Sequence, residues 1–369
     1  MDARAYWVGF NLVKGIGAVR LRMLLEHFGN LEVAWQASGD VFAKIGLPQK
    51  SIEHFQRIRR EVDLERVWER IVSQGISVLT WEDSAYPRRL KEIDQAPPLL
   101  YYRGELLNED EFAIAVVGTR RVTAYGRQVA EELAVFLAQN GLTVVSGLAR
   151  GVDALAHDAV IKAGGRTLAV LGSGVDRIYP PEHRNLAQRI MAQGAILSDY
   201  APGTPPDGIN FPPRNRIISG LTLATVVVEA GETSGALITA AFAANQGRDV
   251  LAVPGNINAP QSKGCNLLIQ QGARPYLRPD DILDVLKVEQ IQEKRGARQI
   301  LTTDAIEASL LQVVGFEPQH IDEIRALTGL PIEQVSATLA IMELKGMIRQ
   351  VGGLNYVAVR ENLGRYREK

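Results

Sequence analysis

The middle of the chain alternates short apolar runs with longer segments of helical periodicity. Residues 112–117 form an unbroken run of alanine, isoleucine and valine behind Phe112, which is typical of a strand buried on both faces. Gly118 and Thr119 follow, and apolar residues then recur at helical spacing over residues 129–137. A strand, a glycine turn and a helix make a βα unit, and the N-terminus of such a helix favours anions. The pattern therefore fits a phosphate-bearing ligand, although many α/β proteins contain this turn without one.

The same alternation continues to about residue 287 and predicts a mostly parallel sheet covered by helices on both faces. Further strands are expected at residues 142–145, 167–171, 195–198, 223–229 and 250–253. Each of them is followed by Gly, Ser, Arg or Asn. The carboxyl ends of strands in an open α/β sheet meet at one crevice, so we expect the ligand site there. We bound this α/β domain at residues 111–288.

The N-terminal part, residues 1–72, is predicted to be all-helical. Gly15-Ile16-Gly17 lies between two apolar helical runs and resembles a helix–hairpin–helix turn, whose backbone N–H groups can bind a phosphate. A small helical domain of the SAM-like kind that contacts protein explains the pattern equally well, and both interpretations stay open. Residues 73–110 predict a turn-rich connector with a short strand near each end, and the placement of the prolines argues against regular structure between the strands.

The C-terminal part predicts a polar linker, residues 289–308, followed by a winged-helix domain, residues 309–369. One helix ends at Gly329, a second begins after Pro331, and Gly352-Gly353 marks a two-residue hairpin. Two glutamates and no arginine lie on the second helix, so duplex DNA should be repelled rather than read. We expect this domain to serve protein contacts or regulation. The exposed face of its second helix is formed by Glu333, Gln334, Ser336, Thr338 and Glu343, with Lys345 at its end and Arg349 in the wing.

Length, charge and cysteine content limit which kinds of protein this chain can be. The 369 residues are enough for two or three domains, and the net charge of −1 means that any nucleic-acid site must be a local patch. The single cysteine, Cys265, excludes an internal disulfide framework and a cysteine-based zinc site, and it fits a reducing compartment. No apolar stretch is long enough to span a bilayer, and no residues have metal-ligand spacing. We expect a cytoplasmic protein without a metal, a cofactor or a membrane partner.

The most specific chemical cluster is residues 211–219. Phe211 is followed by two prolines, and Arg214 and Arg216 flank Asn215 at the start of a helix. Arginines there oppose the helix macrodipole unless an anion offsets them. An aromatic ring beside guanidinium groups suits single-stranded nucleic acid. An internal ion-pair network with Asp199 or Glu229 is the alternative.

Two more turns carry polar or basic residues at the same predicted edge. Ser234-Gly235 opens a helix after a strand, either as a phosphate cradle or because Gly235 allows a tight contact between helix and sheet. Lys263 lies at a glycine turn, and together with Arg120, Arg214 and Arg216 it predicts a local basic pocket. His157 follows Asp153 by four residues, a pair that is more often structural than catalytic.

Taken together, these segments resemble the DNA-processing protein A family (DprA, also called Smf). The resemblance rests on an ordered series across the whole α/β domain: residues 116–120, 145–153, 169–176, 179–180, 210–220, 228–230, 234–240 and 253–255. The Gly-Ser-Arg turn that is frequent in the family is Gly118-Thr119-Arg120 here, which keeps the arginine.

The resemblance implies a non-enzymatic protein with an extended Rossmann-like domain that binds single-stranded DNA. Family members protect incoming DNA during natural transformation, load the recombinase RecA onto it, and commonly form homodimers through the Rossmann domain. The DNA contacts implied for this chain are Gly118, Thr119, Arg120, Phe211, Arg214, Asn215, Arg216 and Lys263.

An enzyme is the alternative. The glycine-rich helix start after a strand that carries Glu229 also resembles the nucleoside-monophosphate phosphoribohydrolases. Those enzymes carry a Pro-Gly-Gly-x-Gly-Thr signature, whereas this chain has Ala-Gly-Glu-Thr-Ser-Gly at residues 230–235.

Overall fold

The computed structural model describes residues 2–286, 309–310, 313–315, 318–344 and 348–358. The chain forms two compact units, Met1–Leu283 and Asp284–Lys369, each with its own hydrophobic core. Each unit is described below by itself. The predicted linker, residues 289–308, lies outside the described residues. Within the described residues, no helix has the length and apolar character needed to cross a bilayer.

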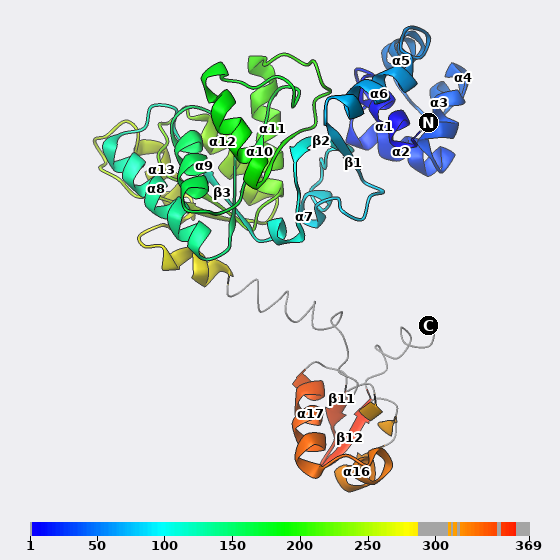
Figure 1. Ribbon diagram of the computed structural model, residues 1–369, viewed down its shortest axis with the longest axis vertical. Coiled ribbons are helices and arrows are strands. Elements are labelled where there is room, and N and C mark those ends of the chain that lie inside the picture. The colour runs from blue at the N-terminus through cyan, green and yellow to red at the C-terminus, as the bar shows by residue number, and fades with distance from the viewer. Residues whose placement is uncertain (1, 287–308, 311–312, 316–317, 345–347, 359–369) are drawn as a thin grey trace. The chain divides into compact units, whose positions relative to one another are not determined.

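A nine-stranded sheet forms the centre of the first unit (Figure 1). Its strands are β1 (Ser77–Thr80), β2 (Leu99–Gly104), β3 (Ala113–Val117), β4 (Thr143–Ser146), β5 (Thr167–Val170), β6 (Ala195–Ser198), β7 (Ala224–Val227), β8 (Asp249–Ala252) and β9 (Arg274–Pro275). They are arranged in the order β1-β2-β6-β5-β4-β3-β7-β8-β9. All pairings from β6 to β9 are parallel, whereas β2 runs antiparallel to both β1 and β6. The predicted mostly parallel sheet is confirmed.

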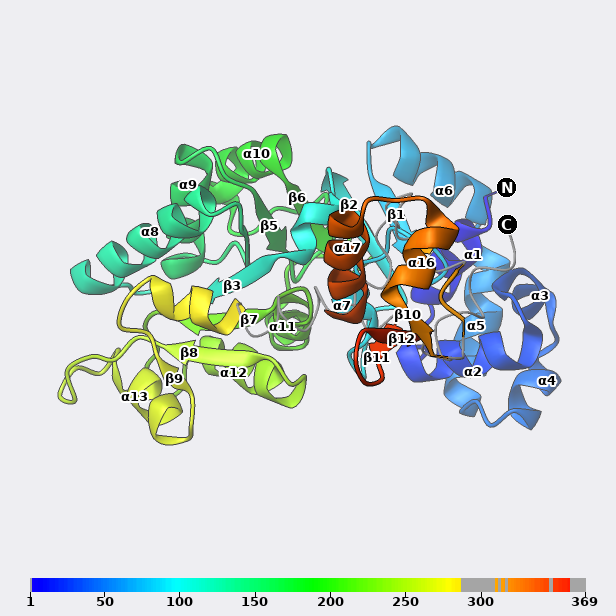
Figure 2. The same ribbon diagram turned by 90° about the horizontal axis from the view of Figure 1, so that it is seen from below.

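Helices cover both faces of this sheet, which explains why its strands are nearly continuous apolar runs. One face is covered by α8 (Ala124–Gln139), α9 (Val152–Lys162) and α10 (Arg184–Gln193) (Figure 2). The other face is covered by α11 (Phe211–Gly220), α12 (Gly235–Asn245) and α13 (Lys263–Gln270) (Figure 2). Every residue of β3, β4, β5, β6 and β7 is buried.

The strand order reverses between β3 and β7. From β3 the chain moves outward through β4, β5 and β6, and it then returns to place β7 on the other side of β3. The loops that follow β3 and β7 therefore diverge onto opposite faces, which opens a crevice at the carboxyl ends of these two strands. The crevice begins directly after Val117 and Val227.

The N-terminal part is all-helical, as predicted. It consists of α1 (Arg4–Asn11), α2 (Ala18–Phe28), α3 (Leu31–Gln36), α4 (Gly39–Lys44), α5 (Gln49–Glu61) and α6 (Leu64–Ser73). Its aromatic centre includes the stacked rings of Phe10 and Phe55, 5.5 Å apart. Trp7 also packs edge-on against Trp81, at 6.1 Å, and joins this centre to the core of the sheet.

The interpretation of residues 73–110 as a connector is incomplete. These residues contribute β1 and β2, which extend the parallel sheet at one edge. The prolines do not prevent this, because Pro97 and Pro98 lie just before β2, where no ladder hydrogen bond is lost. The expectation of no regular structure between the two strands is wrong, because Pro87 directly precedes the one-turn helix α7 (Arg88–Lys91) and is compatible with a helix start.

The second unit has the predicted winged-helix arrangement. It contains β10 (Gln319–His320), α16 (Ile321–Thr328), α17 (Ile332–Leu344), β11 (Ile348–Gln350) and β12 (Asn355–Ala358). Gly329 ends α16 with a φ of 68°, and Gly352 and Gly353 turn the hairpin with φ values of 87° and 56°. The short strand β10, which pairs with β12, was not expected.

Candidate functional site

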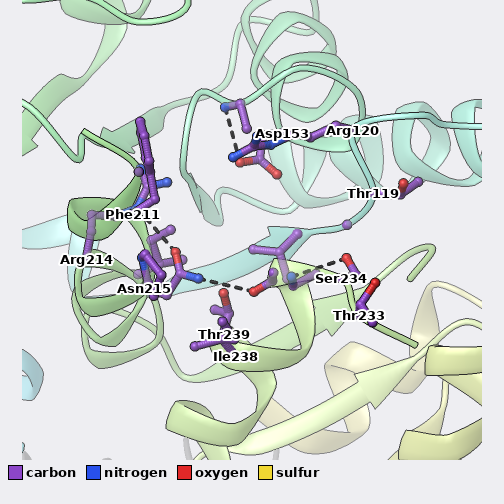
Figure 3. Close-up of a pocket in the computed structure, with 18 of the residues that line it drawn as sticks. Thr119, Arg120, Asp153, Phe211, Arg214, Asn215, Thr233, Ser234, Ile238 and Thr239 are labelled. Atoms are coloured by element: carbon purple, nitrogen blue, oxygen red, sulfur yellow. Dashed lines mark hydrogen bonds between the residues drawn. The ribbon is translucent and has the colours of Figure 1, made fainter. Parts of the chain in front are cut away.

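A cavity of about 710 Å³ lies at the crevice between β3 and β7 (Figure 3). Three segments far apart in the sequence form most of its wall: the turn after β3, the first turn of α11 and the start of α12. Their lining residues are Gly118, Thr119, Arg120, Arg121, Phe211, Pro212, Arg214, Asn215, Gly231, Thr233, Ser234, Gly235, Ala236, Ile238 and Thr239. The cavity lies at the carboxyl edge of the sheet, where the sequence predicts a ligand site.

Phe211 is held at the cavity wall by the chain around it. It is the first residue of α11, and Pro212 and Pro213 fix the backbone of the first helical turn. The ring lies against Gly172, just beyond β5, where an added Cβ would come within 2.7 Å of Phe211 Cδ1. Glycine at this position therefore lets the ring lie against the end of the strand. The ring of Tyr179 is its neighbour, with the centroids 5.8 Å apart.

Arg120 places a free positive charge beside this ring. Its guanidinium carbon is 6.0 Å from the centroid of Phe211, within the range of a cation–π interaction. Both Arg120 and Arg121 are exposed at the cavity, and neither forms an ion pair with another described residue. Their charges are therefore available to an anion from outside the protein.

Arg214 is a different kind of cation, because only 5% of it is exposed. Its Nη1 donates a hydrogen bond to Gly147 O at 2.9 Å and another to Val170 O. Asp153 is buried nearby and accepts hydrogen bonds from the backbone N–H groups of Gly147 and Ala149, at 3.1 and 3.3 Å. An added Cβ on Gly147 would lie 2.7 Å from Arg214 Nη2 and 2.8 Å from Asp153 Oδ2. Only glycine at this position leaves space for both charged groups.

The two buried charges perturb each other and are perturbed by burial. Burial lowers the pKa of Arg214 to about 10, and the nearby Asp153 carboxylate opposes that shift. Burial raises the pKa of Asp153, against the opposing effects of Arg214 and the two backbone N–H groups. Arg214 therefore stays charged at neutral pH, and its charge is largely offset inside the protein. It forms the floor of the site and braces the ends of β4 and β5.

Of the four cations expected in one pocket, Arg120 and Arg214 line the cavity, whereas Arg216 and Lys263 do not. Arg216 Nη2 is 2.8 Å from Asp199 Oδ2, and its Nε donates to Gln95 O at 2.9 Å. This is the internal ion pair that the sequence left open as the alternative, and it directs the guanidinium away from the cavity. Lys263 is exposed outside the cavity wall, 3.5 Å from Glu232 Oε1.

The helix start after β3 does not offer an empty anion site. Glu229 follows β7 and is only 3% exposed. Its Oε2 accepts from the backbone N–H of Thr123 at 2.9 Å, and its Oε1 accepts from the hydroxyl of Thr123 at 2.5 Å. A carboxylate of the protein thus occupies the N-terminus of α8. The sequence could not show this, because the two residues are far apart along the chain.

The helix start after β7, in contrast, opens into the cavity. Ser234, Gly235 and Ala236 line it, and Ser234 Oγ accepts from Ala236 N at 3.3 Å. Asn215 fixes this turn from α11, since its Nδ2 donates to Gly235 O at 3.2 Å (Figure 3). A Cβ on Gly235 would meet no atom within 4 Å, so a tight contact between helix and sheet does not explain this glycine. The open helix start is the interpretation that remains.

His157 has a structural environment. It is fully buried, and its Nδ1 lies 2.6 Å from Thr167 Oγ1. Because that hydroxyl donates to Val144 O, Nδ1 carries the proton in this hydrogen bond. Burial lowers the pKa of His157 to about 3. It does not line the cavity, and Asp153 is bound by backbone N–H groups instead.

Arg121, Tyr179 and Thr233 also line the cavity, although they were not among the expected DNA contacts. Tyr179 belongs to a Tyr-Pro pair within the family resemblance, which was the available signal. Arg121 and Thr233 are neighbours of residues that had been singled out. No group of three or more His, Cys, Asp or Glu side chains in the described part of the chain could hold a metal ion.

Comparison with known proteins decides the family. Residues 77–287 match the family described as DNA recombination-mediator protein A, and residues 295–353 match the DprA winged helix domain. The chain belongs to the DNA recombination-mediator protein A family. Protein Smf of Synechocystis is 38% identical over 96% of this chain and 98% of its own length. DNA processing protein DprA of Bacillus subtilis is 42% identical over 62% of this chain and 77% of its own length.

Solved structures of the family share the fold. The crystal structure of DNA processing protein A from Streptococcus pneumoniae superposes with a TM-score of 0.69 at 35% identity. It matches 77% of this chain and 98% of its own. DNA processing protein A from Helicobacter pylori, whose structure is described by its single-stranded DNA binding mode, has a TM-score of 0.52 at 28% identity. That match covers 58% of this chain and 96% of the other, and the resemblance in the sequence is confirmed.

Proposed function

We propose that this protein binds single-stranded DNA in the cavity, protects it during natural transformation and helps to load RecA onto it. The observation that carries the proposal is the free guanidinium of Arg120 beside the half-buried ring of Phe211. A base can stack on the ring while the neighbouring phosphate meets the cation. The relative from Helicobacter pylori, described by its single-stranded DNA binding mode, supports this choice of ligand.

The bases of the ligand must be unpaired. In a duplex the faces of the bases are occupied by their neighbours, whereas a single strand can turn its bases onto an aromatic ring. We assign the phosphate contacts to Gly118, Thr119 and Arg120 and the stacking contact to Phe211. Asn215 orients the open start of α12 toward the same strand.

The remaining three cations of the family pattern have different roles in this proposal. Arg214 supports the floor of the site and contributes a screened charge. Lys263 contacts DNA outside the cavity after separating from Glu232, since both side chains are exposed. Arg216 has no direct contact with DNA, because Asp199 and two backbone oxygens bind its guanidinium.

We further propose that the cavity binds and does not catalyse. Among its described lining residues, Asp153 is the one carboxylate, and no histidine or cysteine is present. Asp153 is buried and bound to two backbone N–H groups, so it is poorly placed to attack a ribose. Incubation with each nucleoside monophosphate should release no free base. Release of base would favour the phosphoribohydrolase alternative.

The partners are carried over from the family. We propose a cytoplasmic homodimer that associates through the Rossmann-like sheet unit and delivers bound DNA to RecA. Light scattering coupled to size exclusion should give twice the mass of one chain. RecA filament growth on oligo-dT should begin sooner when the protein is present.

The decisive experiment for DNA binding is a salt titration with oligo-dT and with a duplex of equal length. Because the proposed site needs both a bare base and a phosphate, oligo-dT should bind more tightly than the duplex at every salt concentration. The logarithm of the binding constant should fall linearly with the logarithm of salt concentration. Equal binding of the two ligands would contradict the proposal.

A further inference from the structure

A second, smaller hollow adjoins the main cavity. It is lined by Arg120, Gly147, Ala149, Arg150, Tyr179, Pro180, Phe211 and Arg214. Five of these residues also line the main cavity, namely Arg120, Ala149, Tyr179, Phe211 and Arg214. The two hollows are therefore continuous around the rings of Phe211 and Tyr179. The smaller hollow has a volume of only about 20 Å³, so a strand bound on Phe211 would run across its mouth rather than enter it.

Tyr179 offers a second aromatic surface along this path. Its side chain is 38% exposed, and its ring plane is inclined by 41° to that of Phe211. Because the rings are tilted and not stacked face to face, neither ring covers the other. The centroids are 5.8 Å apart, which is more than the ~3.4 Å rise per nucleotide of stacked DNA. Two successive bases could each lie on one ring only if they separate from each other.

Arg150 supplies a cation that lines the smaller hollow and not the main cavity. Its Nε is 2.5 Å from Glu182 Oε1, and the two side chains are 57% and 49% exposed. Water and salt screen an exposed ion pair of this kind, so it contributes little to stability. A DNA phosphate can therefore replace the Glu182 carboxylate at small cost. Arg150 would then follow Arg120 as the next cation along the strand.

We propose that Tyr179 and Arg150 form a second nucleotide subsite for single-stranded DNA. Tyr179 stacks the base next to the one on Phe211, and Arg150 leaves Glu182 to bind the following phosphate. This inference rests on the proposed function, since it extends the same bound strand by one nucleotide. The subsite selects strands that unstack easily, because the tilted rings force neighbouring bases apart. Oligo-dT, which stacks weakly, should therefore bind more tightly than oligo-dA of the same length.

The first test measures binding of the full-length protein to oligo-dT across a salt series. Tyr179→Ala should weaken binding about five-fold or more, with an unchanged salt slope, because a stacking contact is lost. Tyr179→Phe keeps the ring and should bind as the parent does. Arg150→Ala should reduce the magnitude of the salt slope by about 0.7, because one phosphate contact is lost.

The ion pair gives a matched pair of variants. Glu182→Gln frees Arg150 without removing it, so binding should be tightened about two-fold or more at low salt, where charges are least screened. The same substitution in the Arg150→Ala background should have no such effect. Glu182→Gln binding that is weaker than that of the parent would overturn the assignment of Arg150.

Cross-linking distinguishes a direct contact between Tyr179 and DNA from a role in which Tyr179 only positions Phe211. Oligo-dT with 5-iodouracil at single positions should cross-link to Phe211 from one nucleotide and to Tyr179 from the adjacent one. If Tyr179→Ala binds as tightly as the parent and no cross-link reaches Tyr179, the second subsite is overturned while the proposed function stands. If the parent protein does not bind oligo-dT, the proposed function fails and the subsite fails with it.

Discussion

The carboxylate of Glu229 caps the N-terminus of α8 through Thr123, by hydrogen bonds to both its backbone N–H and its hydroxyl. The N-terminus of α8, the first helix of the α/β domain, is therefore already occupied by a carboxylate of the protein itself. A Cβ at Gly126, in the first turn of α8, would overlap the Glu229 carboxyl group. The close approach of the end of β7 to α8 depends on this glycine. Because Glu229 occupies the start of α8, the start of α12 is the helix terminus that opens into the cavity.

Glu229→Ala should lower the free energy of unfolding by about 1–3 kcal/mol, because two hydrogen bonds from Thr123 to a buried carboxylate are lost. Glu229→Gln, which keeps one acceptor oxygen, should lose less. Urea denaturation followed by circular dichroism measures both variants. If Glu229→Ala is as stable as the parent, the hydrogen bonds between Glu229 and Thr123 do not stabilise the protein.

Arg120→Ala and Arg216→Ala form a matched pair, because the first removes an exposed cation and the second a paired one. Arg120→Ala should reduce the magnitude of the salt slope of oligo-dT binding by about 0.7 and leave stability unchanged. Arg216→Ala should leave the slope unchanged and cost roughly 2–3 kcal/mol of stability, since Asp199 would remain without its partner. If Arg216→Ala changes the salt slope of oligo-dT binding, Arg216 contacts DNA after all.

Phe211 should contribute to binding through its ring alone. Phe211→Ala should cost about 1–3 kcal/mol of binding to oligo-dT, and the salt slope should not change because no phosphate contact is lost. Gly172→Ala should weaken binding in the same way, because its Cβ would displace the ring from the end of β5. Fluorescence anisotropy with labelled oligo-dT measures both. Parent-like binding by Phe211→Ala would make this ring a structural residue.

His157 should make stability depend on pH in weakly acidic solution. Its pKa is lowered from the usual 6.5 to about 3 in the folded protein, so the unfolded chain binds a proton that the native state does not. Stability from this group is therefore complete above pH 6.5 and falls as pH decreases toward 3. Between pH 7.5 and pH 5 the loss should be about 2 kcal/mol. The stability of the His157→Asn variant should not show this part of the pH dependence. If its stability changes with pH as that of the parent does, His157 is not a buried, neutral ring in the folded protein.

The order of strands and helices was predictable, because each strand of the parallel sheet is an apolar run and each glycine turn lies next to it. The partners of the charged side chains were not. Arg120 and Arg216 look alike in the sequence, yet one is free and the other is paired with Asp199. Arg214 differs from both of these arginines, because it is buried beside Asp153. Ion pairs of this kind join loops that are distant along the chain, so periodicity and composition carry no information about them.

The described part of the second helix of the winged-helix unit offers no cation to duplex DNA. Recognition by a helix–turn–helix places the second helix, here α17, in the major groove. That helix contains no arginine, and Gln334 and Ser336 are exposed on it. Glu343 accepts a hydrogen bond from the backbone N–H of Gln350 at 2.9 Å, which fixes a carboxylate between helix and wing. The wing offers Arg349 as its exposed cation among the described residues.

We therefore predict that residues 309–369 do not bind duplex DNA and serve protein contacts or regulation. Deleting them should leave the affinity for oligo-dT within a few-fold of the parent, because the sheet unit contains the cavity with Arg120 and Phe211. Replacing Gln334 and Ser336 with arginine supplies the missing charge and should create duplex binding that falls steeply with salt. A measurement that finds duplex binding by the unmodified segment near 10⁻⁴–10⁻⁶ M or tighter at physiological salt would contradict the argument, since that is the range of ordinary non-specific binders.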